Sequence, residues 1–462
     1  MFASRCLTSA FETATATDRL DSSPEARVVP EYASSGPGTT AHTALLPTEA
    51  DKQSSRHAER ALDILNVVLA DVRYGLGPYA SIYLLTEHGW NQAAIALAFS
   101  FGSVTGLVSQ APIGAMIDAV RAKRALLAGA VTVVTAACFL VVLAPYFWSV
   151  AFAGVIGALA GSTIGTTMAA ISLGIVGPAA LARRAARNEA LFHAGNGAIN
   201  LTILATAPLF GIVVVFWGLA MAASASVVAV MVVPARAIDH DVARGLLHNT
   251  AQPGRPSSWN ALLTNRPLVV FAGCGALFHM ANASMLGLVV QRLALADPAH
   301  GVALAAACMV AAQLVMVATA TLAGLRANSW GRKPIFLIAF LALAARGALY
   351  TLSSGSAWTI AVQLLDGVGV GVFGALFPVV TADLTRGSGH FNAAQGAVGT
   401  IHSIGGILSG QLAGLTVVWA GYNAAFATMA AIAAIGATLF WLAMPETRDG
   451  SLAGTACAPP TL

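Results

Sequence analysis

The stretch GLRANSWGRK, residues 324–333, forms a short polar turn between two apolar runs, and GAMIDAVRAKR, residues 114–124, lies in a comparable turn earlier in the chain. Each stretch begins with glycine, carries a carboxylate or amide four residues later and ends in basic residues. A second pair, FHAGNGA at 192–198 and FNAAQGA at 391–397, follows the first in the same order. Two matches in one order, with similar separations, indicate an internal duplication.

The composition is that of a membrane protein. Of the 462 residues 57% are hydrophobic and only 10% are charged, whereas a soluble domain carries roughly 25% charged residues. A helix needs about 20 apolar residues to cross the bilayer core, and the apolar runs lack the alternation of barrel strands. We expect an all-α membrane protein with twelve transmembrane helices, near residues 62–86, 93–117, 124–145, 148–173, 188–209, 211–234, 268–290, 302–325, 334–353, 357–382, 392–418 and 422–444.

The runs divide into two groups of six around a polar insert. The first sixty residues are rich in Ser, Thr, Ala and Pro, include eight acidic residues and have no apolar core, which is typical of a disordered tail rather than a targeting segment. The expected parts are a disordered cytoplasmic N-terminal tail (1–60), an N-terminal six-helix bundle (61–234), a cytoplasmic central linker (235–266), a C-terminal six-helix bundle (267–444) and a cytoplasmic C-terminal tail (445–462).

Basic residues gather in alternate loops, those after spans two, four, eight and ten and in the central insert. Cytoplasmic loops hold the excess of Lys and Arg, so both termini are expected in the cytoplasm of a cell membrane, which would be the inner membrane of a Gram-negative cell. This topology accounts for the net charge of +4 and implies no nucleic-acid partner. None of the five cysteines has metal-ligand spacing, and no cofactor is expected.

The turn motif resembles that of the major facilitator superfamily, G-x-x-x-D-R-x-G-R-[RK]. The second-half copy fits at Gly324, Asn328, Gly331, Arg332 and Lys333. In the first-half copy Gly114 and Asp118 match, while Arg121 stands in place of the second glycine and the basic pair Lys123 and Arg124 comes one place late. The chain also has PETR at 445–448, as many members do near their end.

This resemblance implies two six-helix bundles related by a pseudo-two-fold axis along the membrane normal, which rock around a central site. Spans 1, 4, 7 and 10 would line the cavity with help from spans 2, 5, 8 and 11. The ten motif residues named above would form a cytoplasmic gate. The implied partners are a small-molecule substrate, protons and the lipid bilayer, and the expected oligomeric state is a monomer.

FHAGNGA and FNAAQGA would face each other across the cytoplasmic half of the bundle interface. Their small residues let helices approach closely, which is a purely structural explanation. Alternatively, their polar side chains three apart share a helix face and contact the substrate. The residues concerned are His193, Asn196, Asn392 and Gln395.

Span one carries two charges near the membrane midplane, Asp71 and Arg73. A charge in hydrocarbon costs a few kcal/mol even on permissive scales, so each needs a partner or a function. Asp71 is either a structural ion-pair partner or the carboxylate that carries a proton as the cavity opens to each side. Arg73 is either paired or a contact for an anionic substrate.

Span ten carries Asp366, and Arg346 lies at about the same depth in span nine. Because these helices are consecutive, an Arg346–Asp366 ion pair is expected, and Gln363 lies three residues away on the same span. Three further residues, on spans seven and eleven, either line the cavity or bond to neighbours: His279, Asn282 and His402.

Enzyme motifs are absent: the sequence has no H-E-x-x-H, no G-x-S-x-G and no Walker A loop. We therefore expect a secondary active transporter of a small organic solute, proton-coupled and working as an efflux system. An uptake permease or uniporter for an organic anion or other metabolite is the alternative. A non-transporting receptor and a membrane enzyme are more remote ones.

Overall fold

The computed structural model describes residues 49–72, 80, 83–84, 87–90, 92–210, 213–246, 264–296 and 301–448. From Thr48 onward the chain forms one compact unit. Residues 1–48 and 449–462 of the expected tails lie outside the described residues, as does most of the central linker after residue 246. Residues 49–60, which we expected in the disordered tail, instead form the first turns of a helix that continues to Val72.

The described chain is helical, with no strand among its residues. The first half contains α1 (Glu49–Val72), α3 (Gln92–Ala119), α4 (Lys123–Leu143), α5 (Phe147–Phe210) and α6 (Val213–Val232), and two 3₁₀ turns follow, η1 (Ala235–Ala237) and η2 (Val242–Arg244). The second half contains α8 (Arg266–Asn282), α9 (Met285–Ala296), α10 (Gly301–Trp330), α11 (Arg332–Tyr350), α12 (Ser356–Leu384) and α13 (Phe391–Ala443).

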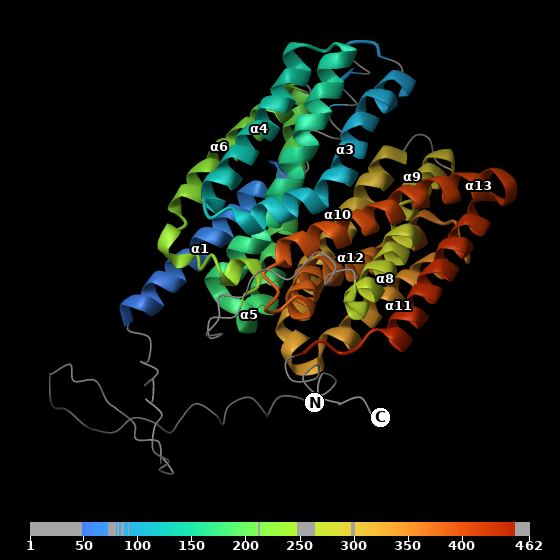
Figure 1. The fold of residues 1–462 in the computed structure, drawn as a ribbon. Coiled ribbons are helices and arrows are strands. Elements are labelled where there is room, and N and C mark those ends of the chain that lie inside the picture. Colours follow the sequence, from blue (N-terminus) through green and yellow to red (C-terminus); the bar gives the residue numbers. More distant parts are fainter. Residues whose placement is uncertain are drawn as a thin grey trace, which may run out of the picture. The chain divides into compact units, whose positions relative to one another are not determined.

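Seven helices in the described part are long and apolar enough to cross a membrane, which confirms the all-α membrane fold. Two of them, α5 and α13, each contain two spans. Each is interrupted by a glycine with positive φ, Gly177 (φ 70°) and Gly421 (φ 81°), a backbone conformation that glycine adopts without steric cost. Figure 1 shows α13 turning back on itself at one end.

The break at Gly177 corrects the expected start of span five. We predicted that this span begins at residue 188 and that Arg183, Arg184 and Arg187 lie in a loop before it. The helix instead resumes directly after Gly177, so these arginines are helical. The following Pro178 suits the first turn of a helix, where its missing N–H has no partner to lose.

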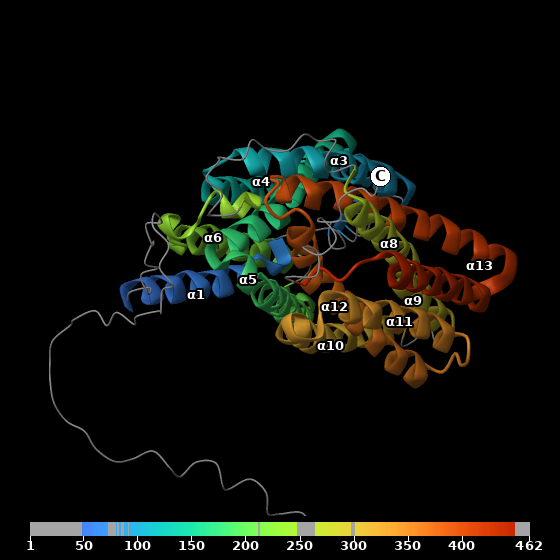
Figure 2. The same cartoon turned by 60° about the horizontal axis from the view of Figure 1, so that its bottom comes forward.

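The two halves meet through helices that are far apart in sequence. α3 packs against α13, and α5 packs against α10 and α12 (Figures 1 and 2). The halves contact each other near the polar turns at 119–123 and 385–390, and we call this end of the bundles the basic end. A Cβ on Gly114 there would lie 2.1 Å from the Asn392 carbonyl oxygen, so only glycine permits this approach.

The described part of the central linker, residues 235–246, packs against the basic end. Its Asp239 N–H donates to Gly174 O at 3.0 Å, and Gly387 N–H donates to Gly245 O at 2.7 Å. Ala243 is fully buried. The linker therefore contacts both halves, which the sequence did not predict.

Candidate functional site

A cavity of about 660 Å³ lies between the two halves. The first half lines it with residues of α1, α3 and α5, and the second half with residues of α8, α12 and α13. Spans one, two, four, five, seven, ten and eleven contribute, as the family resemblance implies, whereas span eight, also expected there, has no residue among the described lining.

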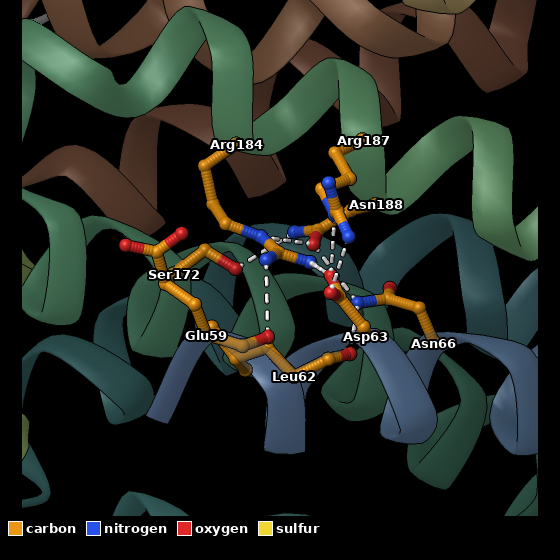
Figure 3. A network of polar contacts seen from close by, with 8 residues as sticks. All are labelled: Glu59, Leu62, Asp63, Asn66, Ser172, Arg184, Arg187 and Asn188. Atoms are coloured by element: carbon orange, nitrogen blue, oxygen red, sulfur yellow. Dashed lines mark hydrogen bonds and ion pairs between the residues drawn. The ribbon is translucent and has the colours of Figure 1, made fainter. Parts of the chain in front are cut away.

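One wall of the cavity is polar and is tied to an ion-pair network at the basic end (Figure 3). Asp63 of α1 forms ion pairs with Arg184 and Arg187 of α5. In each, the Nη2 atom lies 2.7 Å from a carboxylate oxygen of Asp63. The side chain of Arg184 is almost completely buried, whereas that of Arg187 is exposed. The buried pair joins the first and fifth spans.

Asn188 connects this network to the cavity (Figure 3). Its Oδ1 accepts from Arg184 Nε at 2.7 Å and from Asn66 Nδ2 at 2.9 Å. Its Nδ2 donates to Ser172 Oγ at 2.8 Å. Asn66, Ser172 and Asn188 all line the cavity, so the ion pair holds three cavity-lining polar groups in place.

Glu189, the next residue of α5, also lines the cavity. Its Oε1 lies 3.4 Å from Nε2 of His193, one helical turn along, and His193 Nδ1 lies 2.7 Å from Gln313 Oε1 of α10. A Cβ on Gly374 of α12 would lie 2.3 Å from Glu189 Oε1, so the carboxylate rests against bare backbone of the other half. Glu189 and His193 thus lie at the junction of the two halves.

The opposite wall is aromatic and consists of Phe278, His279, Phe373, Phe377 and His402, which we call the aromatic wall. Phe278 and Phe373 stack with ring centroids 4.7 Å apart, and the two histidine rings lie 5.1 Å apart. His402 Nε2 is buried and has no hydrogen-bond partner in the described structure. This wall offers flat apolar surface with a few nitrogen atoms.

The expected Arg346–Asp366 ion pair is confirmed, with Arg346 Nη1 2.6 Å from Asp366 Oδ1. Arg346 is fully buried and also donates to Asn282 Oδ1 at 2.7 Å. Gln363 Nε2 donates to Asp366 Oδ2 at 2.9 Å, and Tyr350 donates to Gln363. Asp366 and Gln363 therefore belong to a buried network in which Asn282 is the one cavity-lining member among the described residues.

Asp118 of α3 accepts hydrogen bonds from the start of α13 at the basic end. Its Oδ1 accepts from Asn392 Nδ2 at 2.8 Å and from the Asn392 N–H at 3.2 Å, and its Oδ2 accepts from the Ala393 N–H at 2.9 Å. A carboxylate at the start of a helix also complements the helix dipole. We call the contact between the two halves along α3 and α13 the seam. Farther along it, Gln110 Nε2 donates to Ser403 Oγ at 3.0 Å.

Several of the other expected gate residues make their polar contacts within their own half. Arg332 contacts Asp383 at 3.1 Å, and the backbone N–H groups of Arg332 and Lys333 donate to Glu446. Lys123 donates to backbone carbonyls of α3 and of the turn that follows it. Arg124 donates to backbone carbonyls at the end of α6. Arg121 and Asn328 are exposed, and Gly331 turns the chain with φ 96°. Between Gly324 and α5 the contact is close packing: a Cβ there would lie 2.1 Å from Ala186 Cβ.

The matched stretches FHAGNGA and FNAAQGA are not at equal depth. Phe391 is the first residue of α13, whereas Phe192 lies fifteen residues after Gly177, about four turns into its span. Phe192 and Gln395 do both line the cavity. Asn392 instead binds Asp118, and Asn196 is half-buried on α5.

Two predicted residues fall outside the described side chains. Asp71 belongs to α1, but its side chain is not among those described, and Arg73 lies beyond the described part of that helix. Their roles stay predictions.

Neither Glu189 nor the Asp63–Arg184 network was predicted from the sequence. Starting span five at Asn188 placed Glu189 at the membrane edge, where a charge needs no explanation. Counted from Gly177 it lies twelve residues along the helix, or about 18 Å. The Gly-Pro dipeptide at 177–178 is a turn signal that could have located the true start.

Comparison with known proteins agrees with this architecture. A family model described as Major Facilitator Superfamily matches residues 62–324 and 272–456. An uncharacterised MFS-type transporter of Mycobacterium tuberculosis, from strains CDC 1551 and H37Rv, is 50% identical over 394 residues, covering 85% of this chain and 94% of the relative.

Two solved structures share the fold. The crystal structure of the human organic anion transporter MFSD10 (TETRAN) aligns with a TM-score of 0.61 and 16% identity, covering 84% of this chain and 99% of the other. The proton:xylose symporter XylE bound to 6-bromo-6-deoxy-D-glucose aligns with a TM-score of 0.69 and 11% identity, covering 87% and 98%.

Two helical halves around a central cavity, built from apolar spans, define an integral membrane transport protein. The chain belongs to the major facilitator superfamily. Members of this family are transporters, so the chain is not an enzyme.

Proposed function

We propose that this protein is a proton-coupled secondary transporter that exports a small organic solute by alternating access. The observation that carries the proposal is the cavity between the halves together with the Asp118 contact that closes one end of their seam. In alternating access the halves rock about a central site, so contacts between them at one end must form and break in each cycle. The protein works as a monomer in this proposal.

The basic end is assigned to the cytoplasm, because the loops rich in Lys and Arg lie there. In this proposal the structure corresponds to a state closed toward the cytoplasm. The protein lies in the cell membrane, with both termini on the cytoplasmic side. Tags on both termini should be unreachable from outside intact cells. A terminal tag labelled from outside would refute this orientation.

The cavity walls support an organic solute with a flat apolar part and a group that donates hydrogen bonds or carries positive charge. The aromatic wall suits the flat part, and Asn66, Asn188 and Glu189 suit the polar group. Among the described cavity-lining residues, Glu189 is the one acidic side chain, and none is Lys or Arg.

The second candidate is an uptake permease or uniporter for an organic anion or another metabolite. The fold is shared with a human organic anion transporter and a proton:xylose symporter, at identities that reflect the fold alone. An anion would need a cation in the cavity, and Arg73, outside the described residues, is the candidate for it. A protein that binds solute but moves none would instead be a receptor.

Reconstitution in liposomes tests the proposal. Flux of flat organic cations, neutral organic solutes and organic anions is measured with and without an imposed pH gradient, and a protonophore should abolish accumulation. Phe373→Ala should weaken apparent affinity by about two- to tenfold, since one aromatic contact is worth about 0.5–1.5 kcal/mol. Phe152→Ala, on an exposed face of α5, is the matched control and should leave affinity unchanged. Flux that ignores the pH gradient would refute proton coupling.

A further inference from the structure

The contact between Glu189 and His193 lacks a hydrogen-bond donor when histidine is neutral and glutamate is ionised. His193 Nδ1 lies 2.7 Å from Gln313 Oε1, an amide oxygen that can only accept a hydrogen bond, so Nδ1 carries a proton. In a neutral imidazole the other nitrogen, Nε2, is then an acceptor. This nitrogen is buried without a hydrogen-bond partner and faces Glu189 Oε1 at 3.4 Å.

Two acceptors therefore face each other when histidine is neutral and glutamate is ionised. One added proton resolves the conflict, either on Nε2 as an imidazolium or on the carboxyl group, because one atom then donates to the other. The contact with Gln313 comes from the other half of the molecule, so this arrangement exists only while α5 and α10 lie together.

From this geometry we propose that Glu189 and His193 form a proton-binding pair whose protonation is linked to the closure of the two halves. While Gln313 accepts the hydrogen bond from Nδ1–H, the pair holds one proton in addition to the Nδ1 hydrogen, either on Nε2 or on the Glu189 carboxyl group. When the halves separate and Gln313 withdraws, the imidazole can place its single hydrogen on Nε2 and donate it to Glu189. The pair is then satisfied with one proton fewer, and that proton leaves through the cavity that Glu189 lines.

The structure describes several other titratable side chains on the helices packed around this part of α5. Asp63 of α1 is bound by Arg184 and Arg187 of α5 itself, and Asp118 of α3 binds the start of α13. On the second half, the remaining groups are the Asp366 carboxylate of α12, held by Arg346 of α11, and the histidines of the aromatic wall on α8 and α13. The described side chain of α10 that reaches the pair is the uncharged Gln313.

The inference rests on the proposed proton coupling and names its site. It is tested without substrate, by ¹⁵N NMR of histidine-labelled protein in lipid nanodiscs, where imidazolium and the two neutral tautomers have different shifts. His193→Gln identifies the signal. We expect Nδ1 of His193 to carry a hydrogen at every pH measured, and the Nε2 signal to show that Nε2 shares a hydrogen with Glu189.

Two variants should change that signal in different ways. Glu189→Gln should change the Nε2 signal to that of a neutral imidazole that accepts a hydrogen bond, because the Gln amide donates to Nε2 without an added proton. Gln313→Leu should move the hydrogen of neutral His193 from Nδ1 to Nε2. Glu59→Gln, an exposed carboxylate of α1, and Gln110→Leu, which breaks a different bond between the halves, should change neither property.

A wild-type His193 that is neutral at pH 7 with its hydrogen on Nε2 would overturn the proposal, because the Gln313 amide would then be turned to donate. The same Nε2 signal in wild type and Glu189→Gln would overturn it as well. Should Glu189→Gln not fold, the wild-type tautomer decides. A proton shared by Glu189 and His193 in a protein whose flux ignores the pH gradient would contradict the proposed coupling and leave the proton site standing.

Discussion

The buried Arg346–Asp366 pair can be removed one charge at a time or as a whole. Arg346→Leu leaves Asp366 with the Gln363 amide as its remaining partner from this network and leaves Asn282 without its donor. Removing one partner of a buried ion pair costs about 3–5 kcal/mol, because the other charge stays buried. Asp366→Leu should cost a similar amount, since the fully buried guanidinium then has only neutral acceptors.

The double replacement, Arg346→Leu with Asp366→Leu, should cost much less than the sum of the single changes. No charge is left in the core, and the Tyr350–Gln363 hydrogen bond remains. We expect a loss of about 1–3 kcal/mol, mainly from the buried amide groups that lose partners. The two single changes together cost about 6–10 kcal/mol, so the coupling energy should be several kcal/mol in favour of the pair.

Equilibrium unfolding in mixed detergent micelles, followed by circular dichroism, measures these free energies. Arg292→Leu is the matched control, because Arg292 of α9 is only partly buried and bonds backbone carbonyls and Asn423 rather than a carboxylate. It should cost about 1 kcal/mol. A double variant as unstable as the sum of the single variants would refute the view that Arg346 and Asp366 act as a pair.

Further predictions concern closure and coupling. Gly114→Ala should keep the basic end from closing, since its Cβ would lie 2.1 Å from an α13 carbonyl oxygen; spin labels across that end should report a longer distance, whereas Gly129→Ala, with no atom within 4 Å, should keep the short one. Burial raises the pKa of Asp118, which lies past the expected span two, to about 6, although hydrogen bonds from the start of α13 lower it. If separation of the halves returns this pKa toward 3.8, the closed end binds protons more tightly, and lowering the pH from 7 to 5 should favour closure by about tenfold. Asp118→Asn should remove this pH effect in the same distance measurement and slow turnover, while solute binding stays within a few-fold. Asp71→Asn should abolish accumulation driven by a pH gradient in liposomes while exchange persists, if Asp71 carries the proton; retained accumulation would favour the Glu189–His193 pair. Arg73→Gln should weaken binding in flux assays, most strongly for an anionic solute.

Local and consecutive features of the chain were predictable from the sequence. The membrane fold followed from apolar runs, because a spanning segment must satisfy its backbone hydrogen bonds internally and present about 20 apolar residues to the bilayer. The Arg346–Asp366 pair followed for a related reason: helices joined by a short turn pack side by side, so charges at equal depth meet. The span boundary at Gly177 was the local feature predicted wrongly, since apolar length alone does not show where a helix begins.

Contacts between the halves were decided by the tertiary structure alone. Asp118 binds residues 274 and 275 positions later in the chain, and His193 meets Gln313, 120 positions later. Sequence spacing predicts which residues share one helix face, but not the rotation and depth at which two distant helices pack. Turn motifs and apolar runs thus determined that this protein has two similar halves in a membrane, whereas helix packing decided that Asp118 closes their seam and that Glu189 faces the cavity.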